Sequence, residues 1–139
     1  MELTHAEGAA VEFRENDEMV YHAVAGLLEP YLGIKIKVDS SLSGLVATHG
    51  HGMECKDTEL DSRVNREATR KTGLRSMIVV PLLHNYKVVG VLKVASSKPN
   101  AFHKEDSIIL NILSALIGSV MFYSNELNNA ELYFQAKHD

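Results

Sequence analysis

The pattern of apolar and polar residues predicts a β-hairpin followed by a long helix. Ser76 to Leu83 and Val88 to Ala95 are two runs rich in β-branched residues, and the polar segment His84 to Lys87 joins them. Two apolar runs of strand length around a short polar turn are typical of a hairpin. A loop over Ser96 to Asn100 follows, and a helical pattern then continues through the rest of the chain.

The long helical pattern carries a stripe of residues, mostly apolar, at alternating steps of four and three. Its members are Ile109, Leu113, Leu116, Val120, Tyr123, Leu127, Ala130 and Phe134. A stripe that continues for roughly three to four heptads is typical of a helix that pairs with another helix. Ile108, Ile112 and Ala115 lie beside the stripe, so we also expect the first half of the helix to pack on its own sheet.

This stripe predicts a parallel homodimer. The expected interface residues are Leu113, Leu116, Val120, Tyr123, Leu127 and Phe134. Asparagines surround Leu127 in the second half of the stripe, and polar residues in a seam weaken pairing and ease shifts of register. We therefore interpret residues 122–139 as a coiled-coil signalling helix that leads to a downstream output domain.

The first third of the chain predicts a second hairpin and an edge strand. Gly8 to Arg14 alternates, with Ala9, Val11 and Phe13 on one face, and Glu18 to Ala25 follows after the turn Glu15 to Asp17. Ile34 to Val38 also alternates, and its lysines are suited to guard an exposed sheet edge.

The middle of the chain predicts two helices around a short strand. Ser40 or Ser41 can cap a helix that runs through Thr48 and ends at the glycines that follow. Met53 to Lys56 is a strand candidate, and Asp57 to Lys71 is a polar helical segment that Gly73 ends. Strands, helices, strands and a helix in this order indicate the α+β class with an antiparallel sheet.

Composition limits the classes of partner. The 139 residues are 45% hydrophobic and 23% charged, with a net charge of −4. That balance gives no electrostatic reason to expect nucleic acid or an anionic membrane. Cys55 is the single cysteine, so an intrachain disulfide and a thiolate metal cluster are excluded, and a reducing cytoplasm is the expected location. No apolar run is long enough to predict a membrane span.

Three sequence blocks resemble the GAF domains of bacterial signalling proteins. Residues 41–44 read SLSG, residues 55–64 fit C-x-D-T-x-x-D-x-R-V, and residues 73–82 fit G-[IL]-R-S-M-x-x-V-P-L. The later GVLKV at 90–94 and F-x-x-E-D at 102–106 are also similar to the family. The resemblance covers residues 4–121 and is specific as a set, although each block alone is weak.

The resemblance implies a GAF-like sheet of five or six antiparallel strands, with helices on both faces and a small-molecule cavity. It implies a domain over residues 1–121 that lacks the helix the family normally has before its first strand. Candidate ligand-binding residues are Tyr21, Cys55, Arg63, Thr69, Arg75 and Ser76. The alternative for Arg63 and Arg75 is a surface ion pair with Asp57 or Asp61, and the alternative for Cys55 is a buried strand residue.

Other chemistry has less support in the sequence. His49, His51, Cys55 and Asp57 are conceivable metal ligands, but their spacing favours a surface turn, and we expect no metal and no cofactor beyond an unidentified small ligand. Free methionine sulfoxide reductases share the GAF fold but use several cysteines. The motif of cyclic-nucleotide-binding GAF domains is incomplete around Phe102, which we interpret as an anchor for the start of the long helix.

The sequence thus predicts a non-catalytic sensing and dimerisation domain. Residues 136–139 read AKHD, similar to the A-x-H-D that precedes GGDEF diguanylate cyclase domains, so a cyclase is the expected output domain. The alternatives are the sensor domain of a histidine kinase, a small enzyme of the same fold, and a purely structural dimerisation module with a collapsed cavity.

Overall fold

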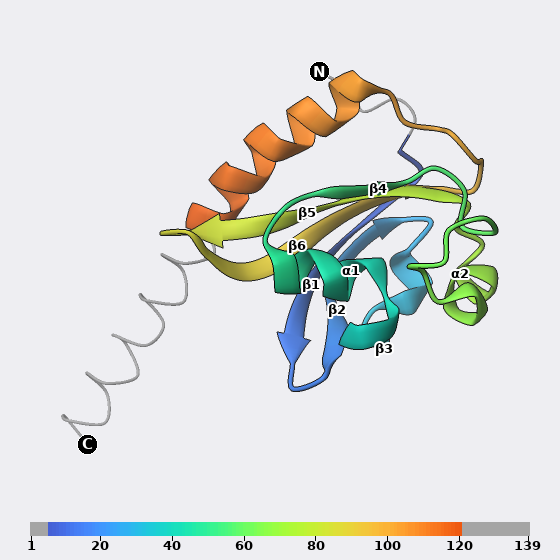
Figure 1. Cartoon of the computed structure of the whole chain (residues 1–139), viewed down its shortest axis with the longest axis horizontal. Coiled ribbons are helices and arrows are strands. Elements are labelled where there is room, and N and C mark those ends of the chain that lie inside the picture. The colour runs from blue at the N-terminus through green and yellow to red at the C-terminus, as the bar shows by residue number, and fades with distance from the viewer. Residues whose placement is uncertain (1–5, 121–139) are drawn as a thin grey trace.

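A curved six-stranded antiparallel sheet forms the centre of the protein (Figure 1). The computed structural model describes residues 6–120. The strands follow the order β3-β2-β1-β6-β5-β4 across the sheet. Their bounds are β1 (Gly8–Glu15), β2 (Glu18–Gly26), β3 (Lys35–Lys37), β4 (Met53–Cys55), β5 (Ser76–His84) and β6 (Lys87–Ser96).

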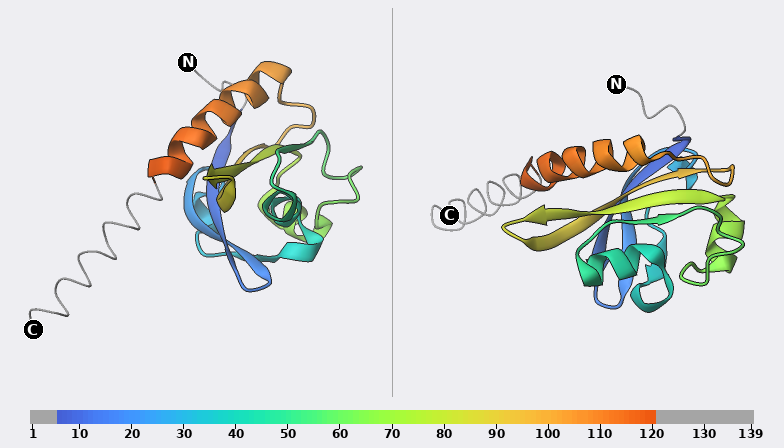
Figure 2. Two further views of the ribbon diagram at one scale, coloured as in Figure 1. Left: turned by 60° about the vertical axis from the view of Figure 1, so that its left-hand side comes forward. Right: turned by 45° about the horizontal axis from the view of Figure 1, so that its top comes forward.

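Helices cover both faces of this sheet. The helix over residues 104–120 lies on one face, and α1 (Leu42–His49) and α2 (Arg66–Thr72) lie on the other (Figures 1 and 2). Two short 3-10 helices, η1 (Glu29–Tyr31) and η2 (Val38–Ser40), flank β3. The predicted α+β, GAF-like class with an antiparallel sheet and a long C-terminal helix is confirmed.

The turns and caps explain why the strands and α1 begin and end where they do. Asn16, Asn85 and Tyr86 have positive φ angles of 59°, 50° and 65°, as tight hairpin turns require. The Ser41 hydroxyl caps α1 by accepting a hydrogen bond from Gly44 N at 3.0 Å. Gly50 ends the helix at a φ of 78°. Both hairpins, the edge position of β3 and the Ser41 cap agree with the sequence predictions.

The helix that we predicted over Asp57 to Lys71 is much shorter in the structure. Only residues 66–72 are helical, and the preceding segment consists of turns. The Asp57 carboxylate accepts a hydrogen bond from Glu59 N, and the Asp61 carboxylate accepts one from Arg63 N, both at 3.0 Å. Such local side-chain bonds to the backbone compete with helix formation, which explains the error.

The C-terminal helix packs on the sheet, but not through the residues that we expected. Leu110 is buried against β5 and β6, and Ile117 is partly buried, whereas Ile108, Ile112 and Ala115 face solvent. Phe102 is buried and anchors the start of this helix, as predicted. A Cβ atom at Gly118 would lie 2.7 Å from the Leu83 carbonyl oxygen, so the helix approaches the β5 backbone more closely than a larger residue would allow. This contact selects which side of the helix meets the sheet.

The opposite face of the sheet contains a buried ion pair. Lys93 Nζ of β6 lies 3.3 Å from Glu12 Oε2 of β1 and donates a hydrogen bond to Tyr21 Oη of β2 at 2.8 Å. Ser43 Oγ of α1 donates to the same Glu12 oxygen at 2.9 Å. The side chains of Lys93 and Glu12 are only 5% and 0% exposed. These contacts join the three central strands to α1.

The surroundings keep Lys93 charged. Burial alone would lower its pKa, but the Glu12 carboxylate and the Tyr21 hydroxyl outweigh burial and raise the pKa above its ordinary value. Burial also raises the pKa of Tyr21, so its hydroxyl stays neutral. Glu12 Oε1 is buried and has no hydrogen-bond partner within the described residues. The carboxylate therefore depends on Lys93 for compensation.

We predict that Lys93→Met destabilises the fold by about 3–5 kcal/mol, because it leaves the Glu12 carboxylate buried without a counter-ion. The double variant with Glu12→Gln removes that charge and recovers most of the loss. Urea unfolding at neutral pH measures both effects. The matched control is Lys37→Met, which breaks an exposed pair with Asp17 and should change stability little. Equal losses from Lys93→Met and Lys37→Met would contradict this role of the ion pair.

Candidate ligand-binding site

A small cavity lies between the sheet and the two short helices. Strands β2, β5 and β6 contribute Tyr21, Met77 and Lys93 to its lining, and α2 contributes its inner side. The full set of lining residues is Tyr21, Ile36, Ser41, Leu42, Val64, Asn65, Ala68, Thr69, Thr72, Leu74, Met77 and Lys93. The cavity is thus largely apolar, and it borders the buried ion pair.

The cavity is nearly filled by its own side chains. About 20 Å³ is open to the centre of a water-sized sphere, which is room for about one water molecule. A larger ligand needs an outward movement of one wall. The wall that α1 provides is fixed, because Ser43 donates a hydrogen bond to buried Glu12 and because a Cβ atom at Gly44 would clash with the Val38 backbone. Within the described residues, α2 makes no hydrogen bond to the ion pair, so we expect α2 to be the wall that moves.

The wall formed by α2 is held by polar contacts and by the packing of Ala68 on the core. Tyr31 Oη donates a hydrogen bond to the Lys71 carbonyl oxygen at 3.1 Å. Asn65 caps the helix by accepting a hydrogen bond from Ala68 N at 3.1 Å, and Gly73 ends it at a φ of 80°. Only Thr69 and Thr72 of this helix are buried. Their hydroxyls donate to carbonyl oxygens of α2 itself and not to the sheet.

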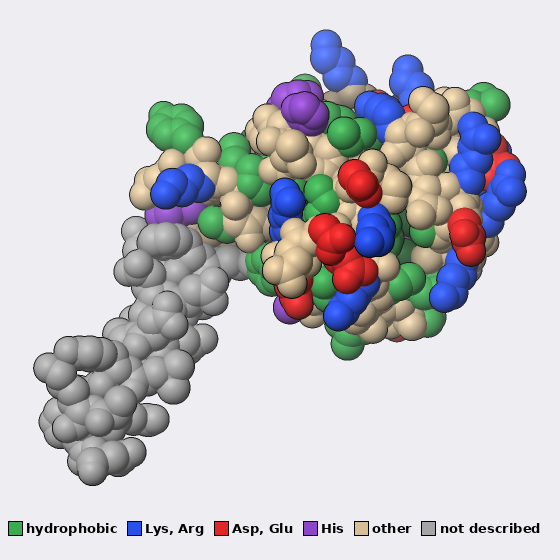
Figure 3. Space-filling view, turned by 60° about the horizontal axis from the view of Figure 1, so that its bottom comes forward, with side chains coloured by type: hydrophobic (Ala, Val, Ile, Leu, Met, Phe, Trp, Pro, Cys, Tyr) green, Lys and Arg blue, Asp and Glu red, His purple; other side chains and the backbone are tan. Residues whose placement is uncertain are grey.

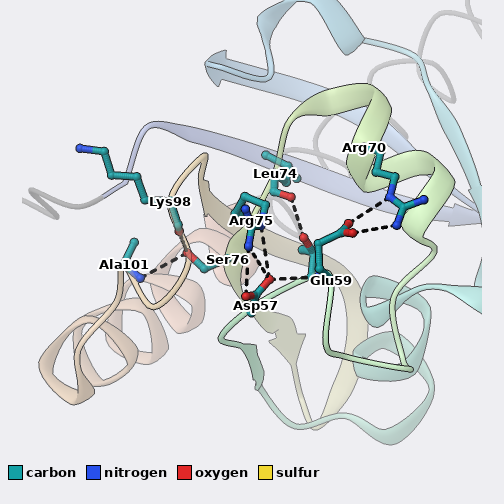
Figure 4. A network of polar contacts seen from close by, with 9 residues as sticks. Asp57, Glu59, Arg70, Leu74, Arg75, Ser76, Lys98 and Ala101 are labelled. Atoms are coloured by element: carbon teal, nitrogen blue, oxygen red, sulfur yellow. Dashed lines mark hydrogen bonds and ion pairs between the residues drawn. The ribbon is translucent and has the colours of Figure 1, made fainter.

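Ion pairs link α2 and the residue directly before β5 to the loop that precedes α2 (Figure 4). Arg70 binds Glu59 with a shortest distance of 2.7 Å, and Arg75 binds Asp57 at 3.1 Å. The hydrogen bond from Arg70 lowers the pKa of Glu59. Acidic and basic side chains are interspersed on the face of the protein that Figure 3 shows. Exposed ion pairs contribute little to stability, so they hold α2 only weakly.

The structure places two of the six predicted ligand-binding residues at this cavity, Tyr21 and Thr69. Ser76 is buried and donates a hydrogen bond to the Lys98 carbonyl oxygen at 2.6 Å, which anchors the loop before the C-terminal helix. Arg75 pairs with Asp57. Ser76 and Arg75 do not line the cavity.

Arg63 and Cys55 also lie outside the lining. Arg63 binds Asp61 at 2.7 Å and donates to the Glu54 carbonyl oxygen at 2.8 Å, and its hydrogen bond lowers the pKa of Asp61 to about 2. The alternative of surface ion pairs for Arg63 and Arg75 is what the structure contains. Burial, with the nearby Asp61 carboxylate, raises the pKa of the Cys55 thiol to about 12. This thiol is therefore protonated at neutral pH and a poor nucleophile.

The cluster of conceivable metal ligands does not converge. The rings of His49 and His51 are 6.1 Å apart, and Cys55 is buried on β4. Within residues 6–120, no group of three or more histidine, cysteine or acidic side chains is placed to hold a metal ion. None of the described helices combines the length and the apolar character that crossing a membrane requires.

The predicted dimer interface is exposed where the structure describes it. Leu113, Leu116 and Val120 are 40%, 65% and 58% exposed. Tyr123, Leu127 and Phe134, with the rest of the predicted coiled coil, lie outside the described residues.

The sequence patterns did not single out Lys93 or Asn65. One signal for Lys93 was present, because a lone lysine within the apolar run Val88 to Ala95 requires an anionic partner if that strand is buried. Asn65 could have been found as the residue that caps α2, had that helix been placed correctly.

The chain is similar to known proteins in both sequence and fold. The sequence model of the GAF domain family matches residues 1–121. A curated relative, described as a probable 3',5'-cyclic phosphodiesterase pde-5 of Caenorhabditis elegans, is 24% identical over 102 residues. That match covers 72% of this chain but only 13% of the relative's length.

Two solved structures have the same fold. The GAF domain of an Acinetobacter phosphoenolpyruvate-protein phosphotransferase is 20% identical, with a TM-score of 0.76, over 91% of this chain and 77% of that one. A free methionine-R-sulfoxide reductase from Neisseria meningitidis, in complex with its substrate, is also 20% identical, with a TM-score of 0.75, over 88% of this chain and 71% of that one. The family match extends over most of the sequence, and the chain belongs to the GAF domain family.

Proposed function

We propose that this chain is a non-catalytic domain that senses a small molecule in the cavity between its sheet and α2. GAF domains are generally small-molecule-sensing or regulatory domains, and some structural neighbours of this chain are enzymes. The observation that supports a sensor here is a cavity with one fixed wall and one weakly held wall. The protonated state of Cys55 supports the absence of thiol chemistry.

Ligand binding at this site requires α2 to move outward and then close on the ligand. The polar contacts that resist the movement are the exposed pair of Arg70 with Glu59 and the hydrogen bond from Tyr31 Oη to the Lys71 carbonyl oxygen. Breaking such pairs costs little, because water solvates the separated charges. A ligand that fills the apolar lining offsets that cost by burying its own apolar surface.

Native mass spectrometry of the purified protein, before and after denaturation, tests the sensor proposal. We expect a discrete extra mass on the folded protein that is lost on unfolding. The variant Ala68→Trp places a large side chain at the cavity lining and should abolish the extra mass. Leu60→Trp, at an exposed leucine outside the lining, is the matched control. An extra mass retained equally by both variants would contradict binding in this cavity.

The small volume of the cavity supports a second candidate, a purely structural dimerisation module. About 20 Å³ of free space admits no ligand larger than water without movement of α2. The two candidates differ in one respect that can be measured. A sensor acquires a ligand that changes the exposure of α2, whereas a structural module remains free of ligand under every condition of growth and purification.

We further propose that the chain forms a parallel homodimer through its C-terminal helix. Leu113, Leu116 and Val120 form an exposed apolar stripe, and large exposed apolar side chains at helical spacing favour helix pairing. Ile108 and Ile112 extend the exposed apolar surface at the start of the same helix.

In this proposal the paired helices relay the state of the cavity to an output domain of the parent protein, a diguanylate cyclase. The reason for a cyclase is the sequence AKHD at residues 136–139, which lies outside the described residues. A histidine kinase is the alternative output.

Replacing Leu113 and Leu116 together by Glu should convert the dimer to a monomer, because like charges would face each other across the seam. Sedimentation velocity over a range of protein concentrations measures the change. The monomer should keep its fold, since both leucines are exposed. Leu60→Glu, an exposed leucine distant from this helix in sequence, is the control and should leave the dimer intact. A wild-type chain that sediments as a monomer at high micromolar concentration would contradict the proposal.

A further inference from the structure

We infer that the cavity selects an uncharged, compact, mainly apolar molecule that presents hydrogen-bond acceptors, such as a carbonyl oxygen or a ring nitrogen. This inference rests on the proposed sensing function and assigns the chemical class of the ligand. The hydrogen bonds and charges of the residues at the cavity wall support this assignment.

The strongest polar groups that remain available at the cavity wall are donors. Lys93 has three N–H groups, and Tyr21 Oη and Glu12 Oε2 engage two of them. Tyr21 Oη accepts its hydrogen bond from Lys93, and within residues 6–120 no hydrogen bond that its own O–H group donates is found. Both side chains line the cavity.

Two further lining residues also have unused donors. Asn65 uses its Oδ1 atom to cap α2, and no described residue accepts from its amide N–H groups. Ser41 uses its hydroxyl oxygen to cap α1 in the same way, which leaves the hydroxyl proton. Each helix cap therefore engages one lone pair of the side-chain oxygen and leaves the N–H or O–H donors of the residue available.

The acceptors that remain at the wall are neutral hydroxyl oxygens. The hydroxyls of Thr69 and Thr72 donate to carbonyl oxygens of α2, which leaves their oxygen lone pairs to accept. Glu12 Oε1 is an unsatisfied acceptor, but Glu12 lies on the side of α1 and does not line the cavity. A ligand that brings donors would meet these neutral oxygens. A ligand that brings acceptors would meet the remaining N–H group of the charged Lys93, and hydrogen bonds to charged groups are the stronger ones.

The charge at the wall argues for a neutral ligand. Among the described residues, Lys93 is the only charged residue in the lining, and Glu12 already compensates it at 3.3 Å. An anionic ligand would bury a second negative charge beside one lysine, and a cationic ligand would face Lys93 without a counter-ion. Both arrangements carry a large desolvation cost. The rest of the lining is mostly apolar, so the part of the ligand that contacts it should be apolar as well. These residues are Ile36, Leu42, Val64, Leu74 and Met77.

Four small aromatic probes of nearly equal size test this inference: acetophenone, ethylbenzene, benzoate and benzylamine. Titration of the isotope-labelled protein at neutral pH, followed by amide NMR shifts, measures each affinity and locates each probe. Acetophenone should bind at least about fivefold more tightly than ethylbenzene, since it gains a net hydrogen bond. It should also bind more tightly than benzoate and benzylamine. Tighter binding of benzoate or benzylamine, or equal binding of ethylbenzene, would overturn the inference.

A matched pair of variants separates recognition from folding. Asn65→Asp keeps the cap of α2, because aspartate caps helices as well as asparagine, but it replaces the donors by an acceptor. The affinity for acetophenone should fall relative to ethylbenzene, and that for benzylamine should rise. Asn16→Asp makes the same change in the exposed β1–β2 turn and should alter no affinity. An unchanged ranking in Asn65→Asp would overturn the assignment of the donors.

The same titrations distinguish failure of the ligand class from failure of the site. If another probe is preferred and shifts the amides around Tyr21, Thr69 and Lys93, the cavity binds small molecules but its selectivity is different. If none of the four probes shifts those amides at millimolar concentration, the inference and the proposed sensing function both fail.

Discussion

The buried ion pair between Lys93 and Glu12 is the interaction on which the arrangement of the inner face depends. Two opposite charges that are almost completely removed from water must stay in contact, because separating them inside the protein is far more costly than separating them in water. Tyr21 and Ser43 complete the cluster from β2 and α1. The pair therefore fixes three strands and one helix relative to one another at the floor of the cavity.

This constraint divides the surroundings of the cavity into a rigid part and a movable part. Helix α1 is tied to the ion pair and approaches the Val38 backbone at Gly44. Within residues 6–120, helix α2 makes no hydrogen bond to the ion pair. Its contacts are a cap, two buried threonines, the packing of Ala68 on the core, a hydrogen bond from Tyr31 Oη to the Lys71 carbonyl oxygen and the Arg70–Glu59 pair. A rigid floor with one weakly held wall allows a ligand to change the position of α2 without disturbing the sheet.

The sequence predicted the parts of the fold that local patterns determine. Alternation located β1 and β3, and runs rich in β-branched residues located β5 and β6. Ser41, Gly50 and Gly73 marked ends of α1 and α2 as capping rules require. It did not predict the short length of α2, because hydrogen bonds of Asp57 and Asp61 to the backbone replaced helical ones. Local patterns also could not predict the buried ion pair beside the cavity. Glu12 occupies a position in the β1 pattern that is typical of a solvent-facing residue, and the packing of α1 over β1 buries it.

Hydrogen exchange of the ligand-free protein, followed by mass spectrometry, tests whether α2 is the movable wall of the cavity and α1 the fixed one. Amides in the α2 segment should therefore exchange much faster than those in α1, although both helices are short and capped. Equal protection of the two helices, with exchange only through global unfolding, would contradict the account and favour a closed structural module.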